Sequence, residues 1–148
     1  MTGQWTIRPG RNQFPIQSPP IRCGGWKHIG WLFFQPTWVD VTKLMSGRRT
    51  RGLADQLYLA LGGIGSQIGE CYSRGTGRDR AMFYEYALGS ARESRDWYYK
   101  ARHVLGESVV AHRLNLLTQI ARLLLVMIPD QQGQQMREEA AAYGAQDN

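Results

Sequence analysis

Residues 53–68, Leu-Ala-Asp-Gln-Leu-Tyr-Leu-Ala-Leu-Gly-Gly-Ile-Gly-Ser-Gln-Ile, decide the fold class of this chain. Apolar residues recur here at every third or fourth position, which is the spacing that lines one face of an α-helix. The residues on that face are Leu53, Leu57, Leu61, Ile64 and Ile68. Each glycine inside a helix costs about 1 kcal/mol relative to alanine, and a neighbouring backbone that approaches closely usually compensates for it. The segment therefore predicts an amphipathic helix packed tightly against a partner.

Two further helical patterns follow at short intervals. The first runs over residues 78–105, with Thr76 as its expected N-cap and Asp79 in its first turn. Its predicted inward residues are Phe83, Tyr86, Ala87, Ser90, Ser94, Trp97, Ala101 and Val104. The second is capped by Ser108 and stopped by Pro129. Its predicted inward residues are Val110, Leu114, Leu117, Ala121, Leu124 and Ile128. The short connections make the three helices antiparallel neighbours.

The segment before these helices has neither helical nor alternating periodicity. Five of the six prolines and four of the five tryptophans lie in residues 1–47. We therefore divide the chain into an irregular, basic segment rich in Trp, Pro and Gly at 1–51, a helical bundle at 52–129 and a polar tail at 130–148. The predicted fold is an all-α, up-and-down antiparallel bundle with three clear helices. A fourth helix has to come from residues 37–50 or from another subunit.

The net charge of +6 is distributed unevenly along the chain. Residues 1–52 hold eight Lys and Arg residues and one acid, whereas the remainder holds ten basic and eleven acidic residues. The positive charge therefore belongs to the N-terminal third. It ends in a basic patch formed by Arg48, Arg49 and Arg51.

The composition predicts a cytoplasmic protein. The first residues lack the apolar stretch of a secretory signal, and Cys23 and Cys71 belong to no metal-binding spacing. The longest apolar run, residues 123–128, is far shorter than the about 20 residues that span a membrane. We expect reduced thiols and no membrane partner.

No motif predicts an enzyme, a metal, a cofactor or a small-molecule substrate. The three histidines lack the Glu-x-x-His spacing of di-iron bundles, and no serine lies in a Gly-x-Ser-x-Gly motif. Glu70 and Glu93 are the carboxylates expected nearest the bundle interior. They could act as a general acid and base, but pairing with a basic residue such as Arg74 or Arg92 is the favoured interpretation.

Three arginines, Arg74, Arg78 and Arg80, lie within seven residues around the start of the helix predicted at residues 78–105. Arginines at a helix N-terminus can hold phosphate groups, and a solvated charged loop is the alternative. The candidate nucleic-acid-binding residues are Arg74, Arg78, Arg80, Arg48, Arg49 and Arg51.

Residues 52–57 and 83–93, above all the block Ala-Leu-Gly-Ser-Ala-Arg-Glu at 87–93, resemble a bacterial four-helix bundle family. Its members were first noticed in intervening sequences of 23S ribosomal RNA genes. The resemblance covers about residues 52–129. It implies an up-and-down bundle, often a pentameric ring, with no known enzymatic activity. It also implies structural roles for the motif residues Gln56, Glu70, Gly89, Ser90 and Glu93.

In this family a first long helix precedes the position of Gly52. Since residues 1–47 show no helical pattern, we hypothesise that this helix is missing or replaced. A related branch resembles the accessory protein of diversity-generating retroelements, which partners a reverse transcriptase and nucleic acid. The resemblance therefore implies RNA or a ribonucleoprotein as the partner of a homo-oligomer. The alternative is a scaffold for protein–protein contacts or self-assembly that binds no nucleic acid.

Overall fold

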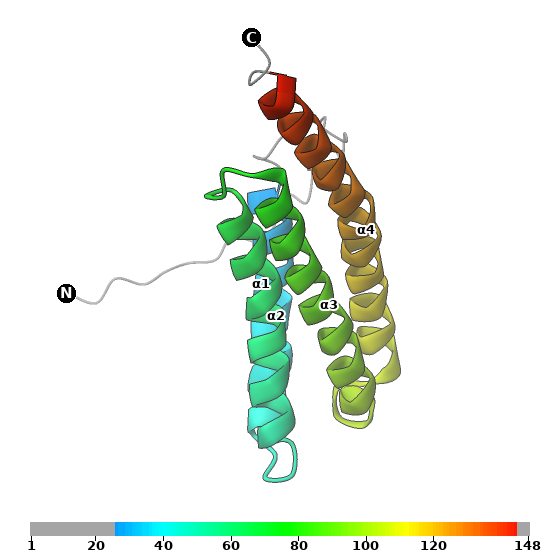
Figure 1. The fold of residues 1–148 in the computed structure, drawn as a ribbon. Coiled ribbons are helices and arrows are strands. Elements are labelled where there is room, and N and C mark those ends of the chain that lie inside the picture. Colours follow the sequence, from blue (N-terminus) through cyan, green and yellow to red (C-terminus); the bar gives the residue numbers. More distant parts are fainter. Residues whose placement is uncertain (1–25, 145–148) are drawn as a thin grey trace, which may run out of the picture.

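The computed structural model describes the backbone of residues 26–144 and the side chains of residues 36–134 and 136–139. Its helices are α1 (Trp26–Met45), α2 (Arg51–Cys71), α3 (Gly77–Leu105) and α4 (Glu107–Gly144). They run up, down, up and down, and the described part of the chain contains no strand (Figure 1). The prediction of an all-α antiparallel bundle is confirmed.

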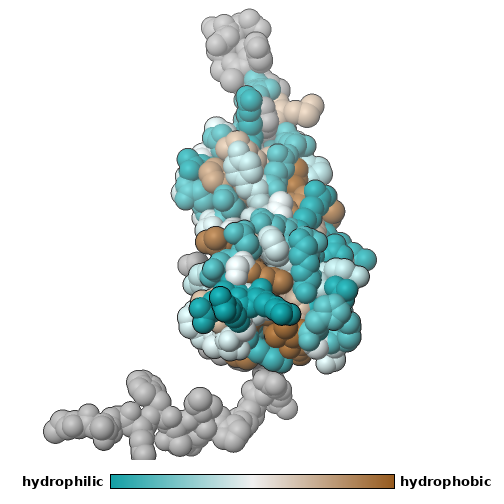
Figure 2. Space-filling model, turned by 90° about the horizontal axis from the view of Figure 1, so that it is seen from below, coloured by the Kyte–Doolittle hydropathy of each residue, from teal (hydrophilic) through white to brown (hydrophobic). Residues whose placement is uncertain are grey.

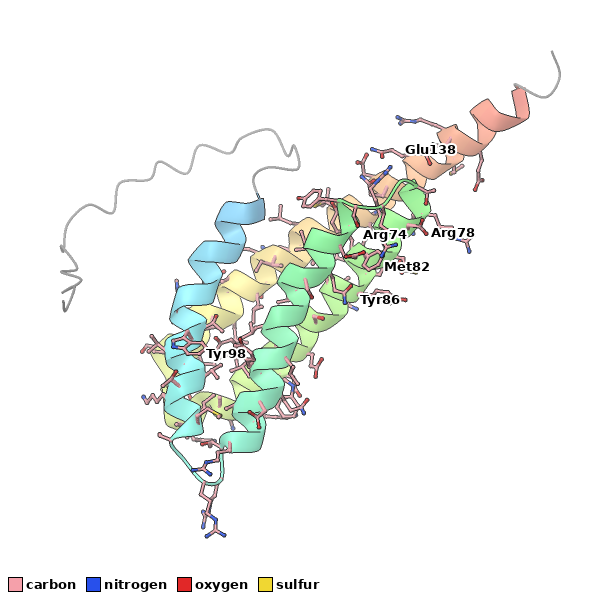
Figure 3. All side chains as sticks on the ribbon, turned by 90° about the vertical axis from the view of Figure 1, so that its left-hand side faces the viewer. Arg74, Arg78, Met82, Tyr86, Tyr98 and Glu138 are labelled. Atoms are coloured by element: carbon pink, nitrogen blue, oxygen red, sulfur yellow. The ribbon has the colours of Figure 1, made fainter. Side chains whose placement is uncertain are left out.

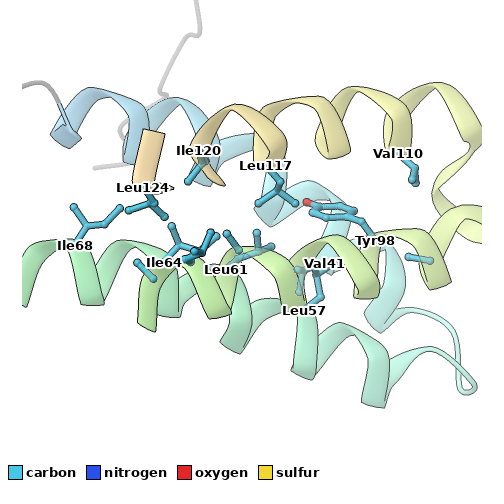
Figure 4. Close-up of a cluster of buried hydrophobic side chains, with 14 of the residues drawn as sticks. Val41, Leu57, Leu61, Ile64, Ile68, Tyr98, Val110, Leu117, Ile120 and Leu124 are labelled. Carbon is cyan, nitrogen blue, oxygen red and sulfur yellow. The ribbon is translucent and has the colours of Figure 1, made fainter. Parts of the chain in front are cut away.

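The core lies along the inner faces of all four helices (Figure 4). The predicted stripe of α2 is buried at Leu57, Leu61, Ile64 and Ile68, and Leu53 packs at its edge. On α4, Leu117 and Leu124 are fully buried. Burying each such side chain stabilises the fold by about 1.5–3 kcal/mol, so this shared core is what holds the bundle together.

The inward face of α3 is rotated relative to the prediction. Ala87, Ser94 and Ala101 are buried as expected, but Tyr86 is 52% exposed and Tyr98 is completely buried. The reason is that α3 packs against both α2 and α4, so its buried face is wider than a single stripe. Further buried residues of this face are Ala81, Tyr84, Leu88, Ala91 and Leu105.

The helix α1 shows that residues 26–45 are not irregular and that the fourth helix is not missing. Of the two sources considered, this chain supplies it, over Trp26–Met45 instead of residues 37–50. Thr37, Asp40, Val41 and Leu44 are buried, and their spacing is that of one helical face. Pro36 lies inside the helix. Proline in a helix interior costs about 3 kcal/mol, which the burial of these side chains against α2 and α3 offsets. Our expectations for residues 1–25 lie outside the described residues.

Two predicted bounds of α4 are also wrong. The helix begins at Glu107, directly after Gly106 at φ 95°, so Ser108 is not its cap. It continues through Pro129 to Gly144 instead of ending at the proline. The physical reason is that α3 and its N-terminal connection contact the continuation of α4 from the side, as described below. The last residues of the predicted tail, 145–148, lie outside the description.

The helix α4 is long and apolar enough, by length and composition, to cross a membrane over Glu107–Glu139. Core helices of helical bundles meet the same criterion, since they are apolar over much of their surface. Along its first half α4 buries Val110, Leu117 and Leu124 against the rest of the bundle. On the side of α4 that faces away from the core, Leu125 is 50% exposed and Val126 is 68% exposed.

Candidate nucleic-acid interface

The two predicted arginine groups lie at opposite ends of the bundle. Arg48 and Arg49 lie in the connection between α1 and α2, and Arg51 opens α2. Arg74 lies in the connection between α2 and α3, at the other end of the bundle (Figures 1 and 3). The 21 residues of α2 separate the two groups, which corresponds to about 30 Å at the helical rise of 1.5 Å per residue. The six arginines therefore do not form one surface.

Arg80 is held by its own chain. Its Nε donates to Oε1 of Gln131 at 2.6 Å, and its Nη2 donates to Oε1 of Gln134 at 3.1 Å. Its Nη1 donates to the carbonyls of Arg74 and Gly75 at 3.2 and 3.1 Å, and Nη2 pairs with Glu138 at 3.5 Å. These bonds connect the α2–α3 connection to the far half of α4. Arg80 therefore has a structural role in this arrangement.

Arg74 and Arg78, the other two arginines at this end, differ in the contacts that their side chains make with the rest of the chain. Arg74 pairs with Glu70 one turn earlier and lies 4.6 Å above the ring of Phe83. Arg78 is exposed, points away from the bundle in Figure 3, and has no side-chain partner among the described residues. The amide of Gly77 donates to Glu138 at 3.4 Å, so the N-terminus of α3 already faces a carboxylate. Arg78 is the one of the three predicted arginines that this arrangement leaves available.

The cations at the α1–α2 end are unpaired. Figure 2 looks onto this end, which is largely covered by hydrophilic side chains with apolar patches between them. Lys43, Arg48, Arg49 and Arg51 are exposed, and none has a hydrogen-bond or ion-pair partner for its side chain within the described residues. A surface charge that is already paired attracts a charged ligand weakly, whereas an unpaired charge keeps its full electrostatic field. This group, which we call the basic end, is the stronger candidate surface.

The connection that carries the basic end is tightly built. Thr50 Oγ1 donates to the carbonyl of Leu44 and also to that of Gly47, the latter at 3.2 Å. A Cβ at Gly47 would lie 2.5 Å from the same hydroxyl, so only glycine fits there without a shift. The short connection thus holds Arg48 and Arg49 on a defined turn.

Two exposed aromatic rings lie beside each other on the α1–α2 pair. Trp38 is 57% exposed and Tyr58 is 41% exposed. Their ring centroids are 6.3 Å apart and the planes meet at 71°, an edge-to-face arrangement. Sequence reasoning missed this pair because it left open whether residues 37–50 or another subunit supplies the fourth helix. The signal that could have revealed it is the helical spacing of Thr37, Asp40, Val41 and Leu44.

A buried polar network joins three helices and was also not predicted. Asp40 of α1 accepts hydrogen bonds from Arg113 Nε of α4 at 2.7 Å and from the Tyr98 hydroxyl of α3 at 3.1 Å. Asp40 is 5% exposed, and Thr37 lies buried beside it. Burial, followed by the negative charge of Asp40, raises the pKa of Tyr98 far above its ordinary value. The tyrosine therefore stays protonated and acts as a donor.

The expectation that Glu70 and Glu93 lie near the interior is wrong, since both are exposed. Glu70 instead pairs with Arg74, which was the favoured interpretation, and Glu93 accepts from Trp97 Nε1 at 3.2 Å. Both sit on outer helix faces because the small residues beside them, rather than the acids, face the neighbouring helix. Within the described residues, no three His, Cys, Asp or Glu side chains form a group suited to a metal ion.

The remaining motif residues have different positions. Gln56 and Gly89 are exposed, whereas Ser90 is half-buried. A Cβ placed on Gly63 would lie 2.7 Å from Ser90 Oγ, so the predicted close approach of two helices occurs at this glycine. At the other glycines of α2 an added Cβ would meet nothing within 4 Å, so the same prediction is wrong there. These are Gly52, Gly62, Gly65 and Gly69.

These features define the class of protein as a four-helix bundle with an unpaired basic end. The sequence model of the 23S rRNA-intervening sequence protein family matches residues 34–125, more than half of the chain. The chain belongs to this family, as the resemblance indicated. The match begins within α1 and ends within α4, so the second part of α1 lies inside the matched region. No curated protein and no solved structure was found to match.

Proposed function

We propose that this protein is a non-enzymatic, self-associating bundle that binds RNA, free or within a ribonucleoprotein, through its basic end. The observation that carries the proposal is that Lys43, Arg48, Arg49 and Arg51 are exposed and unpaired within the described residues. Cations of this kind bind the phosphate backbone and release its counterions. The family description names an RNA, which supports testing RNA first.

The local charge balance supports an anionic partner at this end. The acid nearest in sequence on α1, Asp40, is buried and paired with Arg113, so it does not offset the basic end. On α2, Asp55 is exposed one turn after Arg51, and no ion pair joins the two. Along residues 43–55, four exposed cations therefore accompany one exposed carboxylate, which favours a polyanion over an ordinary protein surface.

Self-association is supported by apolar side chains on outer faces. Val126 on α4 and Val39 on α1 are 68% and 65% exposed, and Leu59 on α2 is 66% exposed. Copies arranged in a ring, as the family resemblance implies, would cover such residues and repeat the basic end around an axis. Several weak phosphate-binding surfaces on one assembly then bind a long RNA far more tightly than one surface.

The same apolar side chains support the alternative function, a scaffold that assembles with itself or another protein and binds no nucleic acid. The two functions differ in their response to salt. RNA binding through phosphates weakens steeply as salt rises, whereas apolar assembly does not. We propose the cytoplasm as the site of either function.

The deciding experiment measures mass by light scattering and RNA affinity by fluorescence anisotropy, each over a range of salt. Replacing Arg48, Arg49 and Arg51 together by alanine should weaken RNA binding and lower the salt slope by about 2, at about 0.7 per phosphate contact for single strands. The matched control replaces three other exposed arginines that have no partner among the described residues, Arg92, Arg95 and Arg122. Equal losses in both variants would point to net charge alone. A discrete oligomer that ignores RNA would favour the scaffold.

A further inference from the structure

We infer that the basic end takes single-stranded RNA, with unpaired bases stacking on Trp38 and Tyr58 while the neighbouring cations hold the phosphates. The inference rests on the proposed function and specifies the kind of RNA. Stacking on an aromatic ring requires a base whose face is free, and duplex RNA buries its base faces within the helix. Two exposed rings next to unpaired cations are therefore a feature suited to single strands.

Trp38 and Tyr58 are not covered by a cation, unlike three other aromatic rings among the described residues. Phe83, Trp97 and Tyr99 each lie under a cation of their own chain, at 4.6, 4.2 and 4.2 Å. Neither Trp38 nor Tyr58 has such a cation among the described residues. In their edge-to-face contact, the edge of one ring meets one face of the other ring. The contact between the two rings therefore leaves their other faces uncovered.

The cations lie at a distance that a short run of nucleotides can bridge. Arg51 precedes Tyr58 by two helical turns and lies on the same face of α2, about 10 Å away along the axis. Lys43 follows Trp38 by about 7 Å along α1, toward the same end of the bundle. One strand can therefore stack on the rings and continue toward Arg48 and Arg49.

The described residues leave space beside α2 one turn after Tyr58. Gly62 lies one turn further along the same face, and a Cβ there would meet nothing within 4 Å. Its missing side chain leaves room for a ribose or a second base beside the tyrosine. Asp55 lies one turn before Tyr58 and is exposed, so its charge opposes a nearby phosphate. Asp55→Asn should therefore tighten binding of a single strand.

The test compares a labelled single-stranded oligonucleotide of RNA with its duplex, using the full chain and fluorescence anisotropy. Trp38→Ala and Tyr58→Ala should each weaken single-strand binding by about 5- to 150-fold, the range of one stacked base. Both should leave duplex binding and the salt slope unchanged. Trp38→Phe, which keeps a ring, should restore most of the affinity. Tyr86→Ala, at a ring that is 52% exposed on α3, is the matched control and should change neither.

Each other outcome shows whether the stacking inference, the proposed function or both are wrong. If Arg48, Arg49 and Arg51 matter for RNA binding but the two rings do not, the stacking is overturned and the proposed function stands. If the unaltered protein binds no RNA, both are overturned. If Trp38→Ala instead lowers the mass of the oligomer without weakening single-strand binding, the rings form a contact between copies. Circular dichroism of every variant separates these results from unfolding.

Discussion

Asp40 and Arg113 lie 73 residues apart in sequence, yet Arg113 Nε donates to a carboxylate oxygen of Asp40 at 2.7 Å inside the bundle. Their side chains are 7% and 13% exposed, so water screens this pair poorly. The backbones of α1 and α4 do not approach each other closely within the described residues. The ion pair therefore joins two helices that otherwise pack mainly against α2 and α3.

Removing one partner of this pair should destabilise the protein strongly. Asp40→Ala leaves the guanidinium of Arg113 largely buried without its counterion, which costs about 3–5 kcal/mol. Urea unfolding at one fixed protein concentration measures the change. The double variant with Arg113→Met should lose less than the sum of the single changes. The control is Asp96→Ala, which breaks an exposed pair with Lys100 and should cost at most about 1 kcal/mol.

The stability of the fold should fall at alkaline pH because of Tyr98. Its pKa is raised above the ordinary 10.0, first by burial and then by the charge of Asp40. The unfolded chain therefore releases this proton at lower pH than the folded protein does. The stabilisation is complete below pH 10 and is lost as pH rises above it. Unfolding of Tyr98→Phe should show a shallower alkaline decline than unfolding of the unaltered protein, and equal slopes would contradict this assignment.

Two neighbouring glycines of α2 should respond differently to alanine. Gly62→Ala should raise the free energy of unfolding by about 0.5–1 kcal/mol, since nothing lies within 4 Å of the new Cβ. Gly63→Ala should give a clearly lower stability than Gly62→Ala because its Cβ would meet Ser90 Oγ at 2.7 Å. Adding Ser90→Gly should relieve that contact. Equal stabilities of the two alanine variants, measured by thermal unfolding, would contradict the close approach.

Arg80 should hold the far half of α4 against the rest of the bundle. Arg80→Ala removes hydrogen bonds to Gln131 and Gln134 and the ion pair with Glu138. Amide hydrogen exchange over residues 130–139 should accelerate, while exchange over residues 110–124 should change little. Arg78→Ala, which removes an exposed arginine two residues away that has no partner among the described residues, should leave both unchanged. Acceleration along the whole helix would indicate global destabilisation instead.

Local interactions were readable from sequence because their partners lie within a few residues. The Thr76 side chain accepts from the amide of Asp79 at 3.1 Å, as the capping pattern predicted. The Arg74–Glu70 pair spans one helical turn. The buried stripe of α2 follows from a period of 3.6 residues that the chain itself carries. The all-α class, the antiparallel order and the family were therefore determined by the sequence alone.

Tertiary packing decided the rest. The helix α1 forms despite Pro36 because α2 and α3 bury its inner face, a gain that local propensity does not contain. Tyr98 rather than Trp97 enters the core because α3 is covered from two sides. Arg80 is engaged by partners more than fifty residues away, whereas the arginines of the basic end meet no partner among the described residues. Which cations are free to bind a ligand depends on contacts between distant segments, and only the folded arrangement of the helices establishes those contacts.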